Sequence, residues 1–195
     1  MNEPHIKGAA FGEFIGWYAE QHDLTPIRRV VAALPPEQRA GLEPDAPKLG
    51  VVVSNWYPTT VVDLVLDQIV SLHGENGSRV IAHDGVQVVS ARMFRGLYAV
   101  LFGLVASPTR YARHIQRAWL QLHDTGTREV TIERANEALS VTRNWRGHHP
   151  LMCDITLETM RAVFERMGCD AVEVSRIQCV GAGAPDCRAR VRWRG

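Results

Sequence analysis

The chain has 195 residues, of which 46% are hydrophobic and 22% charged, so it is long enough to bury a core within a single domain. Its formal net charge of +1 gives no global electrostatic case for binding nucleic acid, and no apolar run approaches the ~20 residues that span a bilayer. The N-terminus lacks the basic and apolar regions of a signal peptide, so a cytoplasmic location is expected. Thiols stay reduced in the cytoplasm, which argues against a disulfide framework for the four cysteines.

Helical patterns dominate the first part of the chain. The periodicity predicts helices over residues 7–23, 25–34, 61–74, 93–105 and 109–124. Residues 79–92 carry β-branched residues, which are typical of a strand, as well as helical spacing, and we favour a helix there. Residues 35–50 are rich in proline and glycine and are interpreted as a connector with a short helix. We expect Thr25 to cap the second helix, Gly74 to end the third, and Ser107 to cap the last.

The pattern changes after residue 124. Alternating hydrophobic residues over 127–146 predict a β-hairpin with its turn at 135–138. Residues 152–168 return to helical spacing and end at a glycine, and residues 170–180 and 187–193 predict two further strands. We therefore predict an α+β fold with helices packed on one face of an antiparallel sheet and a C-terminal strand–strand–helix–strand–strand unit. All of residues 1–195 are assigned to one domain, mainly helical over 1–124 and sheet-rich over 125–195.

The last predicted strand has two different faces. Cysteine, alanine, valine and tryptophan alternate along the face expected to be buried, and arginines occupy the other. The arginine face would allow a contact with an acidic partner or a phosphate backbone. We favour another interpretation, in which this is the solvent-facing side of an edge strand and its charges block unwanted pairing with other strands. The arginines in question are Arg188, Arg190 and Arg192.

The cysteines suggest a metal site. Cys179 and Cys187 stand at the two ends of a hairpin turn, and Cys153 lies near the start of the preceding helix. Three thiolates could therefore bind one metal ion. A tetrahedral zinc site needs a fourth ligand, which His148 or His149 would supply; we assign His149 to the set. The alternative is that these are ordinary buried cysteines, and the spacing is not that of a C-x2-C motif.

Aromatic residues suggest an apolar pocket, although a filled core has the same composition. The residues assigned to a ligand pocket are Trp56, Tyr57, Phe94, Tyr98, Phe102, Trp119 and Phe164. The sequence contains no nucleophile elbow, P-loop, dinucleotide fingerprint or H-E-x-x-H motif, so an enzyme is the weakest of the functional hypotheses.

The segment MRAVFERMGCDAVEVSRIQCVGAGAPDCRARVRW (160–193) resembles the end of the 4-vinyl reductase domain. The whole chain, from KGAAFGEFIGWY through SNWYP, is also similar to an uncharacterised myxobacterial family related to the 4-vinyl reductase and heme-NO-binding superfamily. The resemblance implies helices packed on one antiparallel sheet, a fold shared with transport-particle subunits, and small-molecule sensing or scaffolding.

The resemblance also bears on cofactors. Sensory members recognise aromatic compounds and hold zinc with cysteines that match Cys179 and Cys187, with Cys153 as a third ligand. Their glutamate ligand is replaced here by Arg176, so His148, His149 or Glu173 must substitute. Heme is not expected, because the Tyr-x-Ser-x-Arg clamp of the heme-binding relatives is not matched in TRYARH (109–114).

These observations lead to one preferred function and one alternative. The chain is predicted to be a non-enzymatic sensor or regulatory domain that holds a small apolar or aromatic molecule. The alternative is a homodimeric interaction scaffold without a ligand. In either case a homodimer is expected, with no nucleic-acid partner and no membrane span.

Overall fold

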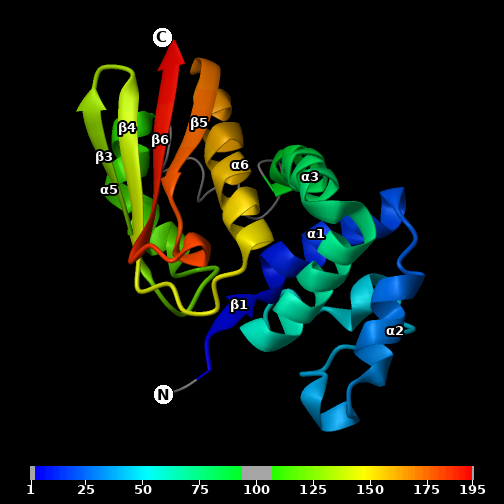
Figure 1. Ribbon diagram of the computed structural model, residues 1–195. Helices are drawn as coiled ribbons and strands as arrows, with labels where there is room; N and C mark the ends of the chain where they lie inside the picture. The colour runs from blue at the N-terminus through cyan, green and yellow to red at the C-terminus, as the bar shows by residue number, and fades with distance from the viewer. Residues whose placement is uncertain (1–2, 94–106, 195) are drawn as a thin grey trace.

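The computed structural model describes residues 3–93 and 107–194, and Figure 1 shows a group of N-terminal helices beside a C-terminal unit that contains the main sheet. The elements in chain order are β1 (His5–Lys7), α1 (Gly8–Gln21), α2 (Thr25–Ala33), η1 (Pro36–Gln38), η2 (Pro47–Gly50), β2 (Trp56–Pro58), α3 (Thr59–Met93), α5 (Pro108–Trp119), β3 (Thr127–Arg134), β4 (Glu137–Arg143), α6 (Pro150–Arg166), β5 (Asp170–Gln178), η3 (Val180–Ala182) and β6 (Asp186–Arg194). The predicted α+β class and the strand–strand–helix–strand–strand unit are confirmed. No helix within the described ranges is long and apolar enough to cross a membrane.

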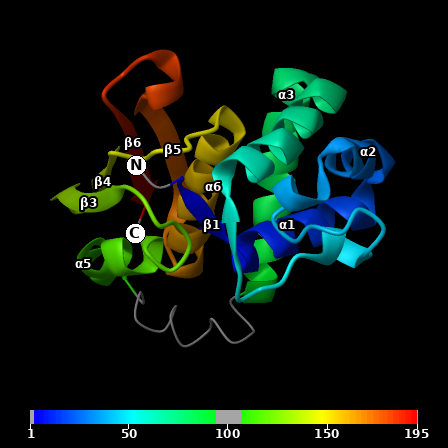
Figure 2. The ribbon, with the colours of Figure 1, turned by 90° about the horizontal axis from the view of Figure 1, so that it is seen from below.

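The main sheet is antiparallel throughout and has the strand order β3-β4-β6-β5. Helices α5 and α6 lie along this sheet, as the view from below also shows (Figure 2). One buried cluster joins them to it: Tyr111 of α5 and Phe164 of α6 pack with Val130, Val191 and Trp193 of the strands. The predicted buried face of the last strand is therefore correct, because alternate side chains of a strand point to the same side.

The interpretation of the last strand as an edge strand is wrong. Strand β6 lies between two neighbours, and Val191 pairs with Ala138 on one side and with Val174 on the other. Its arginines are also partly neutralised, because Arg190 and Arg192 both form ion pairs with Glu137 across the strand pair. The outer face of β6 thus carries paired charges along the middle of a sheet.

The N-terminal helices enclose a second buried cluster. Phe11, Phe14, Ile15 and Tyr18 of α1 are buried against α3, as their spacing predicted. Helix α3 runs through both of the helices predicted over 61–74 and 79–92, with a break at Gly74. The φ of +69° at Gly74 suits glycine, which has no Cβ to clash there.

Three local features differ from the sequence-based expectation. Thr25 is the first residue of α2 rather than its cap; Leu24 precedes the helix, and the Thr25 N–H donates to the Asp23 carboxylate at 2.9 Å. Helix α5 ends at Trp119, five residues early, where the indole N–H donates to the carbonyl of Thr125 at 2.8 Å and the chain turns. The short β1–β2 sheet was not predicted, since strands of three residues show no periodicity. The helix predicted over 93–105 lies outside the described residues.

Candidate ligand pocket and cysteine–histidine cluster

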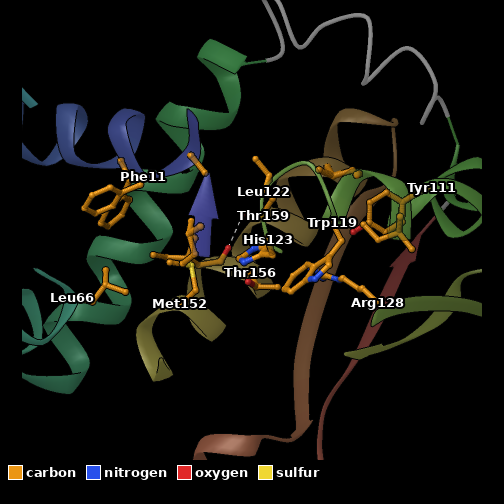
Figure 3. Close-up of a pocket in the computed structure, with 17 residues that line it drawn as sticks. Phe11, Leu66, Tyr111, Trp119, Leu122, His123, Arg128, Met152, Thr156 and Thr159 are labelled. Atoms are coloured by element: carbon orange, nitrogen blue, oxygen red, sulfur yellow. Dashed lines mark hydrogen bonds between the residues drawn. The ribbon is translucent and has the colours of Figure 1, made fainter. Parts of the chain in front are cut away.

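A cavity of about 170 Å³ lies between the N-terminal helices and the C-terminal unit. Its walls come from β1, α1, α3, α5, the start of β3 and α6, and Figure 3 shows their side chains. Most of the lining is apolar or aromatic: Ile6, Ala10, Phe11, Phe14, Leu66, Tyr111, Ile115, Ala118, Trp119, Leu122, Met152, Ile155 and Val163. The polar lining residues are His123, Arg128, Thr156 and Thr159. An apolar cavity with a few polar groups is typical of a small-molecule site.

His123 lies at one end of this cavity and is uncharged near neutral pH. Its ring stacks on the indole of Trp119, with centroids 3.9 Å apart and an interplanar angle of 17°. Burial, and then the positive charge of Arg128, lower the pKa of His123 to about 3. The imidazole therefore offers hydrogen bonds to the cavity without adding a charge.

Arg128, at the start of β3, is 6% exposed. Its guanidinium carbon lies 5.3 Å from the centre of the Trp119 ring, and one terminal nitrogen lies 3.6 Å from the sulfur of Met160. The Nε atom is buried and has no hydrogen-bond partner among the described residues. The charge of this arginine is thus held beside the cavity by weak contacts alone.

The structure separates the aromatic residues that were assigned to a pocket. Trp119 lines the cavity. Trp56 is 39% exposed with the Lys7 ammonium over its ring, Tyr57 is buried with its hydroxyl accepting from the Val52 N–H, and Phe164 packs between Tyr111 and Trp193. Phe94, Tyr98 and Phe102 lie outside the described residues.

Most of the lining residues were not identified from the sequence. On α6, Met152, Ile155, Thr156, Thr159 and Val163 all face the cavity. Their spacing of three and four residues is a signal for one helix face, but a face that lines a cavity and a face that fills a core have the same spacing. His123 and Arg128 gave no signal, because they come together only when α5 packs on β3.

Three cysteines and one histidine form a compact cluster beside the cavity. The ligand atoms of His148, Cys153, Cys179 and Cys187 all lie within 4.8 Å of one another. The Cys179 sulfur is 3.7 Å from that of Cys153, 3.8 Å from that of Cys187 and 3.2 Å from Nε2 of His148. Two thiolates bound to one tetrahedral ion at ~2.3 Å lie about 3.8 Å apart, so these distances suit a four-coordinate metal.

Hydrogen bonds in the cluster favour a thiolate at Cys187. The Cys153 thiol, His148 and the Val180 N–H, which lies 3.4 Å from the sulfur, together lower the pKa of Cys187. The same hydrogen bond to Cys187, with burial, raises the pKa of Cys153. Cys169 lies outside the cluster and packs in the core of the sheet unit.

The histidine in the cluster is His148, whereas the sequence-based assignment was to His149. Both ring nitrogens of His149 are engaged elsewhere: Nδ1 accepts from the Leu151 N–H at 3.1 Å, and Nε2 lies 3.1 Å from the Asp67 carboxylate. His149 thus caps α6 and has no nitrogen left for an ion. The His148 ring lies against Gly181, where an added Cβ would be 2.9 Å from its Cε1 atom.

The Arg176 side chain is turned to a carboxylate rather than to the sulfur atoms of the cluster. Its guanidinium pairs with the carboxylate of Asp154, one residue after Cys153. The pair compensates the arginine charge near the thiols. The fourth position is then supplied by His148 from a different part of the chain.

The comparisons with known proteins give a fold and no sequence family. No protein-family model and no curated protein matches the chain. An Fe(II) unliganded H-NOX protein from K. algicida is 13% identical with a TM-score of 0.68, and 97% of each chain is covered. A structure probing heme distortion in the H-NOX family is 10% identical with a TM-score of 0.69, covering 97% of this chain and 96% of that one. An oxygen-binding H-NOX domain related to soluble guanylate cyclases, in its oxygen complex, is 10% identical with a TM-score of 0.66 and the same coverage.

These neighbours contradict the cofactor prediction made from the sequence. Heme was not expected, yet the similar structures include proteins studied for heme distortion and for heme redox potential, and these structures give no support for zinc. Within the described residues, the neutral imidazole of His123 would supply a nitrogen ligand to a heme iron. A cavity of about 170 Å³ is comparable to one that holds benzene, so a porphyrin does not fit it at this size. Over nearly its whole length the chain has the same fold as these H-NOX structures, and this likeness is one of fold.

Proposed function

We propose that the chain is a non-enzymatic sensor-type domain that binds a small apolar or aromatic molecule in the cavity between α1, α5 and α6. The observation that carries this proposal is the cavity itself, about 170 Å³ and lined mainly by apolar side chains. An apolar protein cavity of this size binds benzene, so a single-ring ligand fits by volume and by chemistry. The H-NOX neighbours, one of them an oxygen complex, support a ligand-binding role for the fold.

In this proposal the cysteine–histidine cluster holds one thiolate-preferring metal ion. Four protein ligands close the coordination shell, which is typical of structural rather than catalytic sites. The ion would fix the turn at η3 against the start of α6, because Cys179 and Cys187 flank that turn and Cys153 belongs to the helix. The wall of the cavity on α6 would then be held in place by the metal.

The direct test is toluene binding measured by calorimetry and by the rise in melting temperature. A ligand that binds only the folded protein stabilises it by RT ln(1 + [L]/Kd), so the melting temperature rises with ligand concentration. Ala10→Phe places a ring in the cavity from α1 and is expected to abolish both signals. Ala32→Phe, on the exposed surface of α2, is the matched control and should bind as the wild type does. Absence of toluene binding to the wild type would contradict direct binding of small aromatic molecules.

Heme is the second candidate ligand, favoured by one observation. His123 offers a neutral imidazole to the cavity, and an imidazole is a common axial ligand. Addition of hemin should then give a Soret band that His123→Ala shifts or removes, while His114→Ala, on α5 outside the lining, leaves it unchanged. A spectrum equal to that of free hemin would remove this candidate.

The proposal also includes the ligand class, the extent of the domain and the oligomeric state that the family resemblance implies. Similarity to the 4-vinyl reductase domain supports an aromatic ligand, and similarity to the myxobacterial family supports a single domain over residues 1–195. A homodimer in the cytoplasm is proposed with them. A stable dimer in native mass spectrometry that binds neither toluene nor hemin would instead favour a scaffold.

A further inference from the structure

Arg128 is a buried cation that has no acidic partner among the described residues. None of the ion pairs formed by the described residues includes it. Arg128 is only 6% exposed, and its buried Nε atom has no hydrogen-bond partner among the described residues. Burying an unpaired charge is costly, so such a group normally meets an anion or ordered water.

The larger cavity offers Arg128 no negative charge from the described residues. The described residues that line the cavity include no aspartate or glutamate, and His123 beside Arg128 is neutral. Figure 3 shows Trp119, His123 and Arg128 near one another and away from Phe11 and Leu66, with Tyr111 on their far side. The positive charge therefore lies in one part of the cavity, and the part near Phe11 and Leu66 is apolar.

Water is the competing partner for this guanidinium. A second, smaller cavity of about 20 Å³ also borders Arg128, beside Ser140 and Thr142, and has room for about one water molecule. One water would satisfy a hydrogen bond but would leave the charge uncompensated. An anion in the larger cavity would satisfy both.

We infer that the cavity is built for a small aromatic or apolar acid in its anionic form, with the carboxylate at Arg128 and the hydrocarbon part toward Phe11 and Leu66. This inference rests on the proposed function, since it names the ligand class of the same site. A planar guanidinium is suited to pair with a carboxylate, and the bond is strongest where water is excluded.

The experiment compares benzoate with toluene near neutral pH. The two probes have rings of the same size and differ in the charged group. Calorimetry should give the wild type a benzoate affinity about tenfold or more above that for toluene, as expected for a charge-assisted hydrogen bond. If toluene binds and benzoate does not bind more tightly, the inference is overturned while the proposed function stands. If neither binds, both are overturned.

Two variants assign the effect to the arginine. Arg128→Met keeps an unbranched apolar stem that ends near the position of Nε, and it removes the buried charge. It should melt at or above the temperature of the wild type, so loss of folding is not expected. It should lower benzoate affinity about tenfold or more and leave toluene affinity within about twofold. Arg134→Met, at the exposed end of the same strand, is the control and should change neither. An equal loss of both ligands, or no loss of benzoate, in Arg128→Met would overturn the inference.

Discussion

The indole rings of Trp119 and Trp145 meet edge to face, with centroids 5.0 Å apart and an interplanar angle of 85°. Trp119 lines the cavity, and the Trp145 ring lies 5.0 Å from the ring of His148. Three rings in contact thus connect the apolar pocket to the cysteine–histidine cluster. The two candidate sites share a buried wall, which belongs to one hydrophobic cluster with Cys153, Cys179 and Cys187.

Removal of Trp145 should be strongly destabilising. Trp145→Ala deletes a side chain that is 5% exposed and leaves a void between the two sites, so the free energy of unfolding should fall by ~3–5 kcal/mol. Urea denaturation measures this change. Trp56→Ala is the matched control: Trp56 is 39% exposed and contacts the Lys7 ammonium, so the cost should stay near 1 kcal/mol. Similar losses of unfolding free energy in the two variants would contradict the role of Trp145 in a buried wall between the two sites.

Cys179 should be indispensable for metal binding, because its sulfur approaches the other three ligand atoms. Cys179→Ser is expected to reduce bound metal from about one equivalent to less than roughly a tenth, and to lower the melting temperature. Elemental mass spectrometry of the purified protein gives both the amount and the identity of the ion. Cys169→Ser, a buried cysteine outside the cluster, should keep its metal. A wild-type protein that carries no metal would show that the cluster is not a metal site.

The two adjacent histidines should have separable roles. His148→Ala removes a ligand and should lower metal content with little effect on α6. His149→Ala removes the cap of α6 and the contact with Asp67, and should cost about 1 kcal/mol of unfolding free energy while metal content is retained. Metal analysis and chemical denaturation of both variants test the pair. Loss of metal in His149→Ala alone would show that the assignment is reversed.

His123 should make stability fall in acid. Its pKa is about 3 in the folded protein and near 6.5 when unfolded, so between these values the unfolded chain binds more protons. The contribution is complete above pH ~6.5 and is lost progressively as the pH falls toward ~3; by pH ~5 about 2 kcal/mol should be gone. His123→Phe, which retains an aromatic ring on Trp119, should lose less stability over the same range. Parallel pH profiles for the two proteins would exclude this role.

The sequence by itself determined the elements and much of their orientation. Helical spacing located α1, α3 and α6, and alternation identified the strands and the buried face that carries Cys187, because both periods are local properties of the chain. The turn between Cys179 and Cys187 was likewise readable, since two strands joined by seven residues with glycine and proline form a hairpin.

Only the tertiary structure decided what these elements surround. Strand order placed β6 inside the sheet, where Glu137 from another hairpin meets its arginines. Two neighbouring histidines were equivalent in the sequence, but the direction of the chain at the start of α6 turned one toward the cysteines and used the other as a cap. The cavity, with an Arg128 that no described carboxylate pairs, depends on how helices far apart in the chain pack. Such long-range packing leaves no periodic pattern in the sequence.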